Sequence, residues 1–139
     1  MAKQSGLGDK LQIDDSGGTL RDISADCTNY GIGNSQNLQD ITGLNKSAIE
    51  RLILLADGEF TVNGIFNPTA NLSHDVFKTR TGTRTVTLDI GGGTTGNPRL
   101  TMEMLVESYA LTRGADGALT WTAALRLQDG TVPVWSTTP

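Results

Sequence analysis

The stretch that decides the fold is ALTWTAALRLQ, residues 118–128. Every second residue of it from Leu119 to Leu127 is apolar, and most of the residues between them are polar. A repeat of two over this length is typical of a strand that buries one face and exposes the other. The stretch therefore predicts an antiparallel sheet with one face packed on a core.

The same alternation occurs in three earlier segments, residues 59–67, 83–90 and 100–109. Residues that favour turns separate the four segments: Asp57-Gly58, Gly91-Gly92-Gly93, Asp116-Gly117 and Asp129-Gly130. A further hairpin is predicted near the start of the chain, where apolar residues flank the turn-like residues 14–18. We therefore expect a mainly β protein, an antiparallel β-sandwich or barrel.

Three segments depart from this pattern. Residues 71–79 place Leu72, Val76 and Phe77 at helical spacing, which predicts one short flanking α-helix over an end of the sheet. Residues 47–56 fit both a helix and a strand, and the surrounding β pattern favours a strand. Residues 25–37 contain few sizeable apolar groups and stay ambiguous.

Length and composition limit the class of protein. The chain has 139 residues, so we expect a single domain of residues 11–139, preceded by a flexible N-terminal segment of residues 1–10. The net charge of −4 argues against tight binding of nucleic acid, although an acidic wall would let DNA slide past without sticking. One cysteine permits no intrachain disulfide, and no signal peptide or membrane span is recognisable. We expect a protein made and kept in a cytoplasm, without membrane partners.

The side chains needed for catalysis or metal binding are scarce. His74 is the only histidine and Cys27 the only cysteine, too few for a zinc site and a poor basis for a nucleophilic triad. The GGGTTG sequence of residues 91–96 resembles a dinucleotide motif, but a strand pattern follows it instead of the helix that such a motif requires. We therefore expect no enzyme activity, no cofactor and no metal.

The order of motifs resembles that of the tail tube (major tail) proteins of long-tailed bacteriophages. The resemblance runs from about Leu11 to Trp135 and rests on ISAD (23–26), DITGLNK (40–46), LADGEFTVNGIF (55–66), LSHDVF (72–77), TVTLDI (85–90), ESY (107–109) and the strand at 118–128. Ala56 stands where the family often has glycine. The motifs are short and loose, so their order carries the resemblance.

The resemblance implies a structural virion protein that assembles with itself. Its subunits would form hexameric rings, and stacked rings would form the tube through which phage DNA passes, in contact with other tail proteins. The location would be the virion tail, after assembly in the host cytoplasm. Residues 1–10 and the loop at residues 36–46 are our candidates for ordering on assembly. They supply the candidate assembly residues Gly6, Asp9, Lys10, Asp40, Ile41, Thr42, Asn45 and Lys46.

Two other classes remain open. One is a different β-protein of the virion, such as a capsid decoration protein or a head–tail joining ring. The other is a small carbohydrate-binding module in which Trp121 or Trp135 would stack on sugars. Trp121 lies on the apolar face of its strand, so we expect it in the core.

Overall fold

The computed structural model describes residues 4–5 and 7–139. A single sheet contains all eight strands, and one short helix, α1 (Ser73–Phe77), packs beside it. The strands are β1 (Lys10–Asp14), β2 (Leu20–Asp22), β3 (Cys27–Asp40), β4 (Arg51–Ile65), β5 (Thr83–Asp89), β6 (Pro98–Arg113), β7 (Leu119–Leu127) and β8 (Val134–Thr137), with a 3-10 turn at Ser24–Asp26. The prediction of a mainly β fold with one short helix is confirmed.

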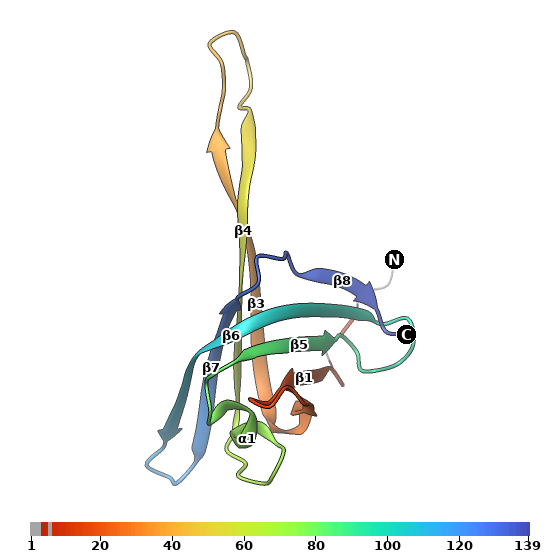
Figure 1. Ribbon diagram of the computed structural model, residues 1–139, viewed down its shortest axis with the longest axis vertical. Helices are drawn as coiled ribbons and strands as arrows, with labels where there is room; N and C mark the ends of the chain where they lie inside the picture. Colours follow the sequence, from red (N-terminus) through yellow and green to blue (C-terminus); the bar gives the residue numbers. More distant parts are fainter. Residues whose placement is uncertain (1–3, 6) are drawn as a thin grey trace.

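The sheet bends back on itself so that its two halves face each other. Its order is β2-β1-β5-β6-β7-β4-β3, and all pairs are antiparallel. Strand β6 belongs to both halves: residues 99–105 pair with β5, and residues 104–113 pair with β7. A register shift lies between Val106 and Ser108, where a bulge bends the strand. Figure 1 shows β5, β6 and β1 crossing the direction of β3 and β4.

The core lies between the two halves. Phe60, Val62, Trp121 and Leu125 face it from one side, and Val86, Leu88, Leu100 and Met102 face it from the other; all are buried. Burying each large apolar side chain contributes about 1.5–3 kcal/mol, so this two-sided burial dominates the stability of the body. The placement of Trp121 in the core is confirmed. Its indole Nε1 donates to the carbonyl of Ile65 at 3.0 Å.

A close approach beside Trp121 requires glycine at position 64. A Cβ on Gly64 would lie 2.1 Å from the carbonyl oxygen of Asp26 and 2.6 Å from Cζ2 of Trp121. Neither the backbone of the 3-10 turn nor a fully buried indole can move away at low cost. Gly64 therefore allows the 3-10 turn and the Trp121 indole to pack directly on the backbone of β4.

Helix α1 is held by two buried polar groups. Asp26 accepts hydrogen bonds from Ser73 N at 3.1 Å and from Asn67 Nδ2 at 2.8 Å, which fixes the start of the helix.

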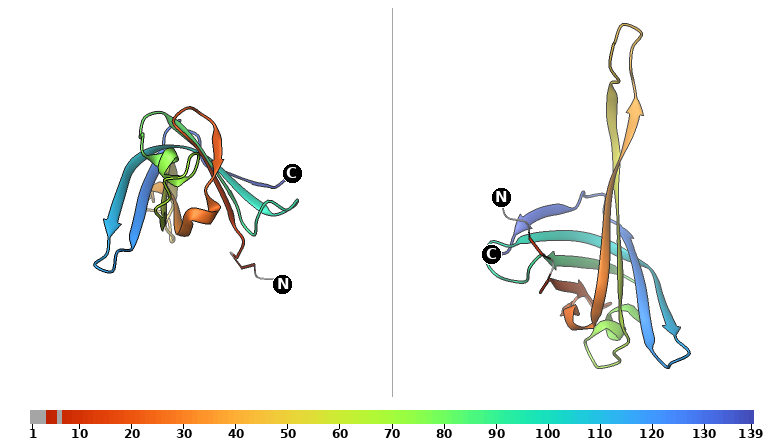
Figure 2. Two further views of the ribbon diagram at one scale, coloured as in Figure 1. Left: turned by 90° about the horizontal axis from the view of Figure 1, so that it is seen from below. Right: turned by 180° about the vertical axis from the view of Figure 1, so that it is seen from behind.

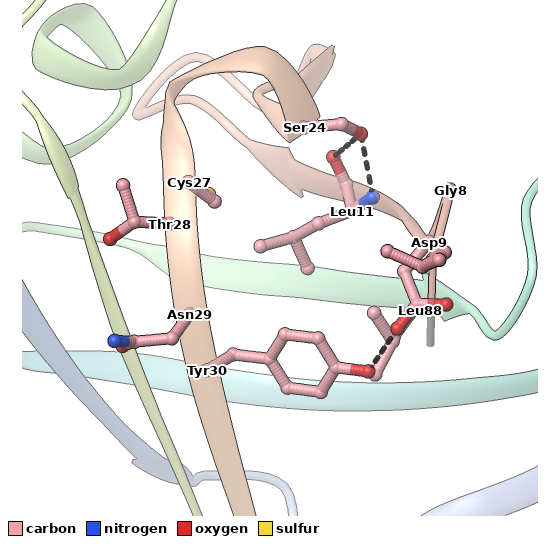
Figure 3. A pocket seen from close by; sticks show the side chains of 10 residues that line it. Gly8, Asp9, Leu11, Ser24, Cys27, Thr28, Asn29, Tyr30 and Leu88 are labelled. Atoms are coloured by element: carbon pink, nitrogen blue, oxygen red, sulfur yellow. Dashed lines mark hydrogen bonds between the residues drawn. The ribbon is translucent and has the colours of Figure 1, made fainter. Parts of the chain in front are cut away.

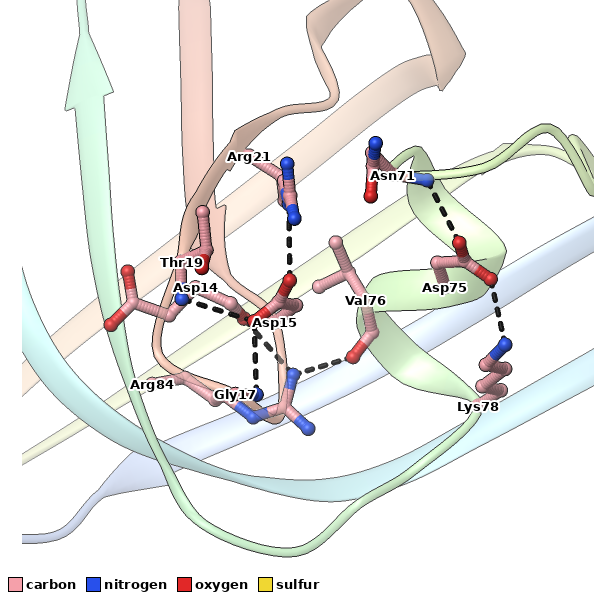
Figure 4. A network of polar contacts seen from close by, with 10 residues as sticks. All are labelled: Asp14, Asp15, Gly17, Thr19, Arg21, Asn71, Asp75, Val76, Lys78 and Arg84. Carbon is pink, nitrogen blue, oxygen red and sulfur yellow. Dashed lines mark hydrogen bonds and ion pairs between the residues drawn. The ribbon is translucent and has the colours of Figure 1, made fainter.

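The second group, Arg84, is completely buried. Its Nη1 donates to the carbonyls of Val76 (2.5 Å) and Asp14 (3.0 Å). Its Nη2 donates to the carbonyls of Thr79 and Thr81. Figure 4 shows this guanidinium between the first hairpin and α1.

Two predictions about local structure were wrong, and one ambiguous segment is assigned. Asp57-Gly58 is no turn but the middle of the 15-residue strand β4, because β3 pairs with it without a break there. Residues 25–37, which stayed ambiguous, belong largely to β3. Residues 36–40 of the expected loop at 36–46 are also part of β3 and pair with β4 as far as Asp40–Arg51. The expected turns at 91–93, 116–117 and 14–18 and the strand after GGGTTG are confirmed.

Candidate assembly surfaces

The most conspicuous feature is a hairpin that extends beyond the body (Figures 1 and 2). We call it the arm and define it as residues 36–57, the outer parts of β3 and β4 with the loop between them. Strand β7 pairs with β4 only from Glu59 to Ile65, so the arm is a two-stranded ribbon. Strands of 14 and 15 residues are far longer than the usual five or six.

The arm exposes an unusual amount of apolar surface. Leu52, Ile53, Leu54 and Leu55 are 48, 70, 43 and 81% exposed, and Leu38, Ile41, Leu44 and Ile49 are exposed as well. Monomeric proteins rarely present contiguous apolar patches of this kind, and an isolated hairpin is at best marginally stable. The arm therefore has the properties of a surface that another molecule covers.

The loop at the arm tip is organised by its own hydrogen bonds. Thr42 donates from its backbone N to Asp40 Oδ1 at 2.9 Å, and its Oγ1 accepts from Glu50 N at 2.8 Å. The bond from the Thr42 hydroxyl to Asp40 (2.6 Å) is the main reason why the pKa of that carboxyl lies below its usual value of 3.8. The tip thus closes the ribbon although none of its side chains is buried.

The structure brings five of the candidate residues together at the tip: Asp40, Ile41, Thr42, Asn45 and Lys46. It places Asp9 and Lys10 at the opposite side of the molecule, in the body. Lys10 is the first residue of β1 and pairs with Asp89. Gly6 lies outside the described residues, so its assignment stays a prediction.

Asp9 lies at a hollow of about 570 Å³ between β1 and the beginning of β3 (Figure 3). Its carboxylate accepts from Gly91 N at 2.7 Å and from the hydroxyl of Tyr30. Burial, followed by the bond to Asp9, raises the pKa of Tyr30. Cys27 also lines the hollow, and burial raises the pKa of its thiol to about 12, so it is a poor nucleophile. In the structure Asp9 thus holds parts of the body together.

Among the described residues, two of the open strand edges of the body bound one segment of the sheet. Within the described residues, no strand pairs with the outer edge of β3, nor with β6 beyond Leu105 on the side where β5 ends. These edges bound a four-stranded segment in the order β3-β4-β7-β6. An open edge presents unpaired backbone N–H and C=O groups, so each can accept a further strand.

The outward face of this segment is polar and carries little charge. Asn63 Nδ2 donates to Asn29 Oδ1 at 2.5 Å, and Thr122 Oγ1 donates to Asn63 Oδ1 at 2.7 Å, so one hydrogen-bonded row crosses three strands. In a second row, Arg126 bonds Glu59 (3.0 Å) on one side and Glu107 (2.9 Å) on the other. That row contains two carboxylates and one guanidinium, a net charge of −1.

The sequence analysis did not select the apolar residues of the arm. It assigned residues 47–56 to a strand, and the strand at 51–56 is confirmed, but they were not recognised as an interaction surface. A signal was present. Leu52 to Leu55 are apolar at four successive positions, so whichever face of the strand turns inward, apolar residues remain on the other.

The described residues offer little for chemistry. No group of three or more His, Cys, Asp or Glu side chains lies together in residues 4–5 and 7–139. His74 is half-buried in α1, with its Nδ1 3.2 Å from the Tyr109 hydroxyl and its ring against Phe66. Among the same residues, no helix has the length and apolar character needed to cross a membrane.

Comparison with known proteins gives no match at the sequence level and clear matches at the level of the fold. No protein-family model and no curated protein matches the chain. The tail of an empty gene transfer agent particle with C6 symmetry is similar with a TM-score of 0.71 and 14% identity, covering 99% of this chain and 100% of that one. A chain in the virion of a native gene transfer agent particle gives 0.67, again with 14% identity, covering 99% of this chain and 100% of that one.

The SPP1 tail tube is similar with a TM-score of 0.72 and 9% identity, covering 97% of this chain and 80% of that chain. The chain thus has the fold of the tail tube proteins of phage-like particles, and the predicted likeness to them is confirmed at the level of the fold.

Proposed function

We propose that this protein is the tail tube subunit of a phage-like particle, a structural protein that does no catalysis. The arm is the observation that carries the proposal: a long ribbon of exposed apolar residues is stable in water only when other molecules cover it. The shared fold supports the same role, because the similar chains belong to a tail tube and to a C6-symmetric tail.

Ring closure would use the two open edges of the four-stranded segment. The free edge of β3 in one copy would pair with residues 106–113 of β6 in the next, so that the sheets join around the ring. This contact is heterologous, and such a contact closes when the rotation between copies fits a whole number of them. C6 symmetry in a similar tail suggests six copies. Backbone hydrogen bonds would supply the contact, and each copy would cover its neighbour's edge.

The outward face of the same segment would then line the lumen. Its rows of Asn, Thr and Ala side chains offer DNA no cationic groups beyond Arg126, which is already bonded to two glutamates. Asp57 lies beside this row, so the face has a small net negative charge that repels phosphate weakly, and DNA would pass with little retention. This is consistent with the expected acidic wall.

Stacking of rings would use the arm. The arm extends along the longest dimension of the molecule (Figure 1), so it reaches past its own ring toward the adjacent one. In this scheme the protein is located in the virion tail after assembly in the host cytoplasm, and its partners are copies of itself, other tail proteins and, transiently, DNA.

Electron microscopy of the concentrated protein tests the proposal. We expect hollow tubes or stacked rings from the wild type, and closed rings without tubes when residues 41–50 are replaced by a short Gly-Ser turn. Rings that never stack under any condition would favour a head–tail joining ring, and persistent monomers would contradict the proposed function.

The role of residues 1–10 is tested separately. The structure ties Asp9 to Tyr30 and Gly91, so the test deletes residues 1–8 and retains those bonds. We expect this deletion to leave the monomer folded and to block polymerisation. Unchanged polymerisation would refute the assembly role of this segment.

A further inference from the structure

The arm is apolar on both faces, and this distinguishes it from every strand of the body. Successive side chains of a regular strand point to opposite faces, so Leu52 and Leu54 share one face and Ile53 points to the other. Between Ile53 and Ala56, β4 has one residue more than β3 has between Leu38 and Gln36, so the alternation shifts there and Leu55 falls on the Leu54 side. Leu38 pairs with Ile53 and lies on the Ile53 face, and Gln39 pairs with Leu52 on the Leu54 face. All of these side chains are exposed.

A contact with a single surface would leave half of this apolar area in water. A strand that packs on one neighbour alternates apolar with polar residues, as β7 does in the body. The run from Leu52 to Leu55 instead has the pattern of a strand buried on both faces. No charged residue interrupts positions 52–56, and the charged side chains Asp40, Glu50 and Arg51 lie toward the tip.

The other end of the molecule offers apolar groups that fit such a contact. Ile65 is the last residue of β4, about 40 Å along the strand from Ile53 at the usual rise per residue. Leu111 lies in the same row across the sheet as Trp121 and Gly64, close to the β6–β7 hairpin. Ile65 and Leu111 are both exposed. Head-to-tail stacking would bring this end of one copy to the arm of another.

We infer that each arm is clamped between two copies of the adjacent ring, with its Ile53 face against one copy and its Leu54 face against the other. This inference rests on the proposed function and makes it more specific. The clamp exists only where two copies lie side by side, so a free monomer offers no complete site for an arm. Stacking would therefore require a closed ring on which to build, which keeps arms from joining single subunits into disordered aggregates.

Two double variants test the clamp: Leu38→Ser with Ile53→Ser on one face, and Leu52→Ser with Leu54→Ser on the other. Gln39→Ser is the control, because it shortens a side chain of the arm without changing its apolar surface. Circular dichroism and thermal unfolding first establish that each monomer is folded. Electron microscopy and sedimentation then give the critical concentration for tube formation.

We expect each double variant to form rings and to raise the critical concentration for tubes at least tenfold, while the control polymerises like the wild type. If one double variant forms tubes at the wild-type concentration, only one face of the arm is covered and the inference is wrong, although the proposed function stands. If the wild type itself forms no tubes, both the proposed function and the inference are overturned.

Discussion

Strand β4 exposes its large apolar side chains before Gly58 and buries most of those after it. Toward its end, Phe60 and Val62 are completely buried between the halves of the sheet. Toward its beginning, Ile53 and Leu55 are mostly exposed on a ribbon that only β3 supports. Both regions are extended and pair with β3, with a register shift between Gln36 and Leu38 at the base of the arm. The difference teaches that the body has a core of its own, whereas the arm exposes apolar residues that no other described part of the chain covers.

The largest effect that this comparison predicts is on monomer stability. We expect Trp121→Ala to lower the free energy of unfolding by about 3–5 kcal/mol, because it leaves a cavity in the core. We expect Leu55→Ala on the arm to change it by less than about 0.5 kcal/mol. Urea unfolding of unassembled protein measures both. A loss above about 2 kcal/mol for Leu55→Ala would show that the arm is packed within the monomer.

A second prediction tests how the body holds α1. Arg84→Met leaves four carbonyl groups without their buried donor, and we expect it to cost about 3 kcal/mol. Arg113→Met, at an exposed position, is the matched control and should change stability by less than about 0.5 kcal/mol. Equal effects of the two substitutions would mean that the guanidinium of Arg84 contributes nothing specific.

A third prediction concerns the start of α1, where we expect a smaller loss of stability. Asp26→Ala removes the acceptor of Ser73 N and Asn67 Nδ2, and we expect a loss of about 1–2 kcal/mol. Asp26→Asn keeps one carbonyl oxygen and should restore part of that loss. Thermal unfolding of the three proteins gives the order, and an asparagine variant less stable than the alanine variant would contradict this reading.

The smallest effect concerns the arm tip and depends on pH. The folded pKa of Asp40 lies below its unfolded value of 3.8, so its bonds to Thr42 stabilise the tip above that pH. The stabilisation is lost as the pH falls through the folded pKa. Hydrogen exchange should then show the amides of Thr42 and Glu50 opening faster relative to those of the body. Asp40→Asn should remove this pH dependence, and an unchanged dependence would exclude Asp40 as its origin.

The sequence predicts the body better than the arm for a physical reason. Alternation marks strands with one dry face, and β5, β6 and β7 all follow it. Arg84 breaks the pattern: a charged residue is expected outside, and its burial is explained by four carbonyls, three from residues 76–81 and one from Asp14 in the first hairpin. Turn-forming pairs are ambiguous, and Asp57-Gly58 shows that a partner strand can hold such a pair extended.

The candidate assembly residues stay predictions, and sequence reasoning singled out the tip of the arm but not its apolar strand. The tip residues Asp40, Ile41, Thr42, Asn45 and Lys46 form one structural unit, as expected of a loop. The apolar run beside them was assigned to a strand, and a strand of apolar residues is ordinarily part of a core. Only the three-dimensional structure shows that no core of this chain reaches Leu52 to Leu55.

The continuation of β3 and β4 from the arm into the body has a mechanical consequence. A pull on the arm moves these two strands together, so it loads the ladder of hydrogen bonds between β4 and β7 along its length. Bonds loaded in this way share the force and resist it together, unlike bonds that open one after another. A tube joined by such arms would transmit tension from ring to ring directly through its wall, and would stretch or bend without its subunits unravelling.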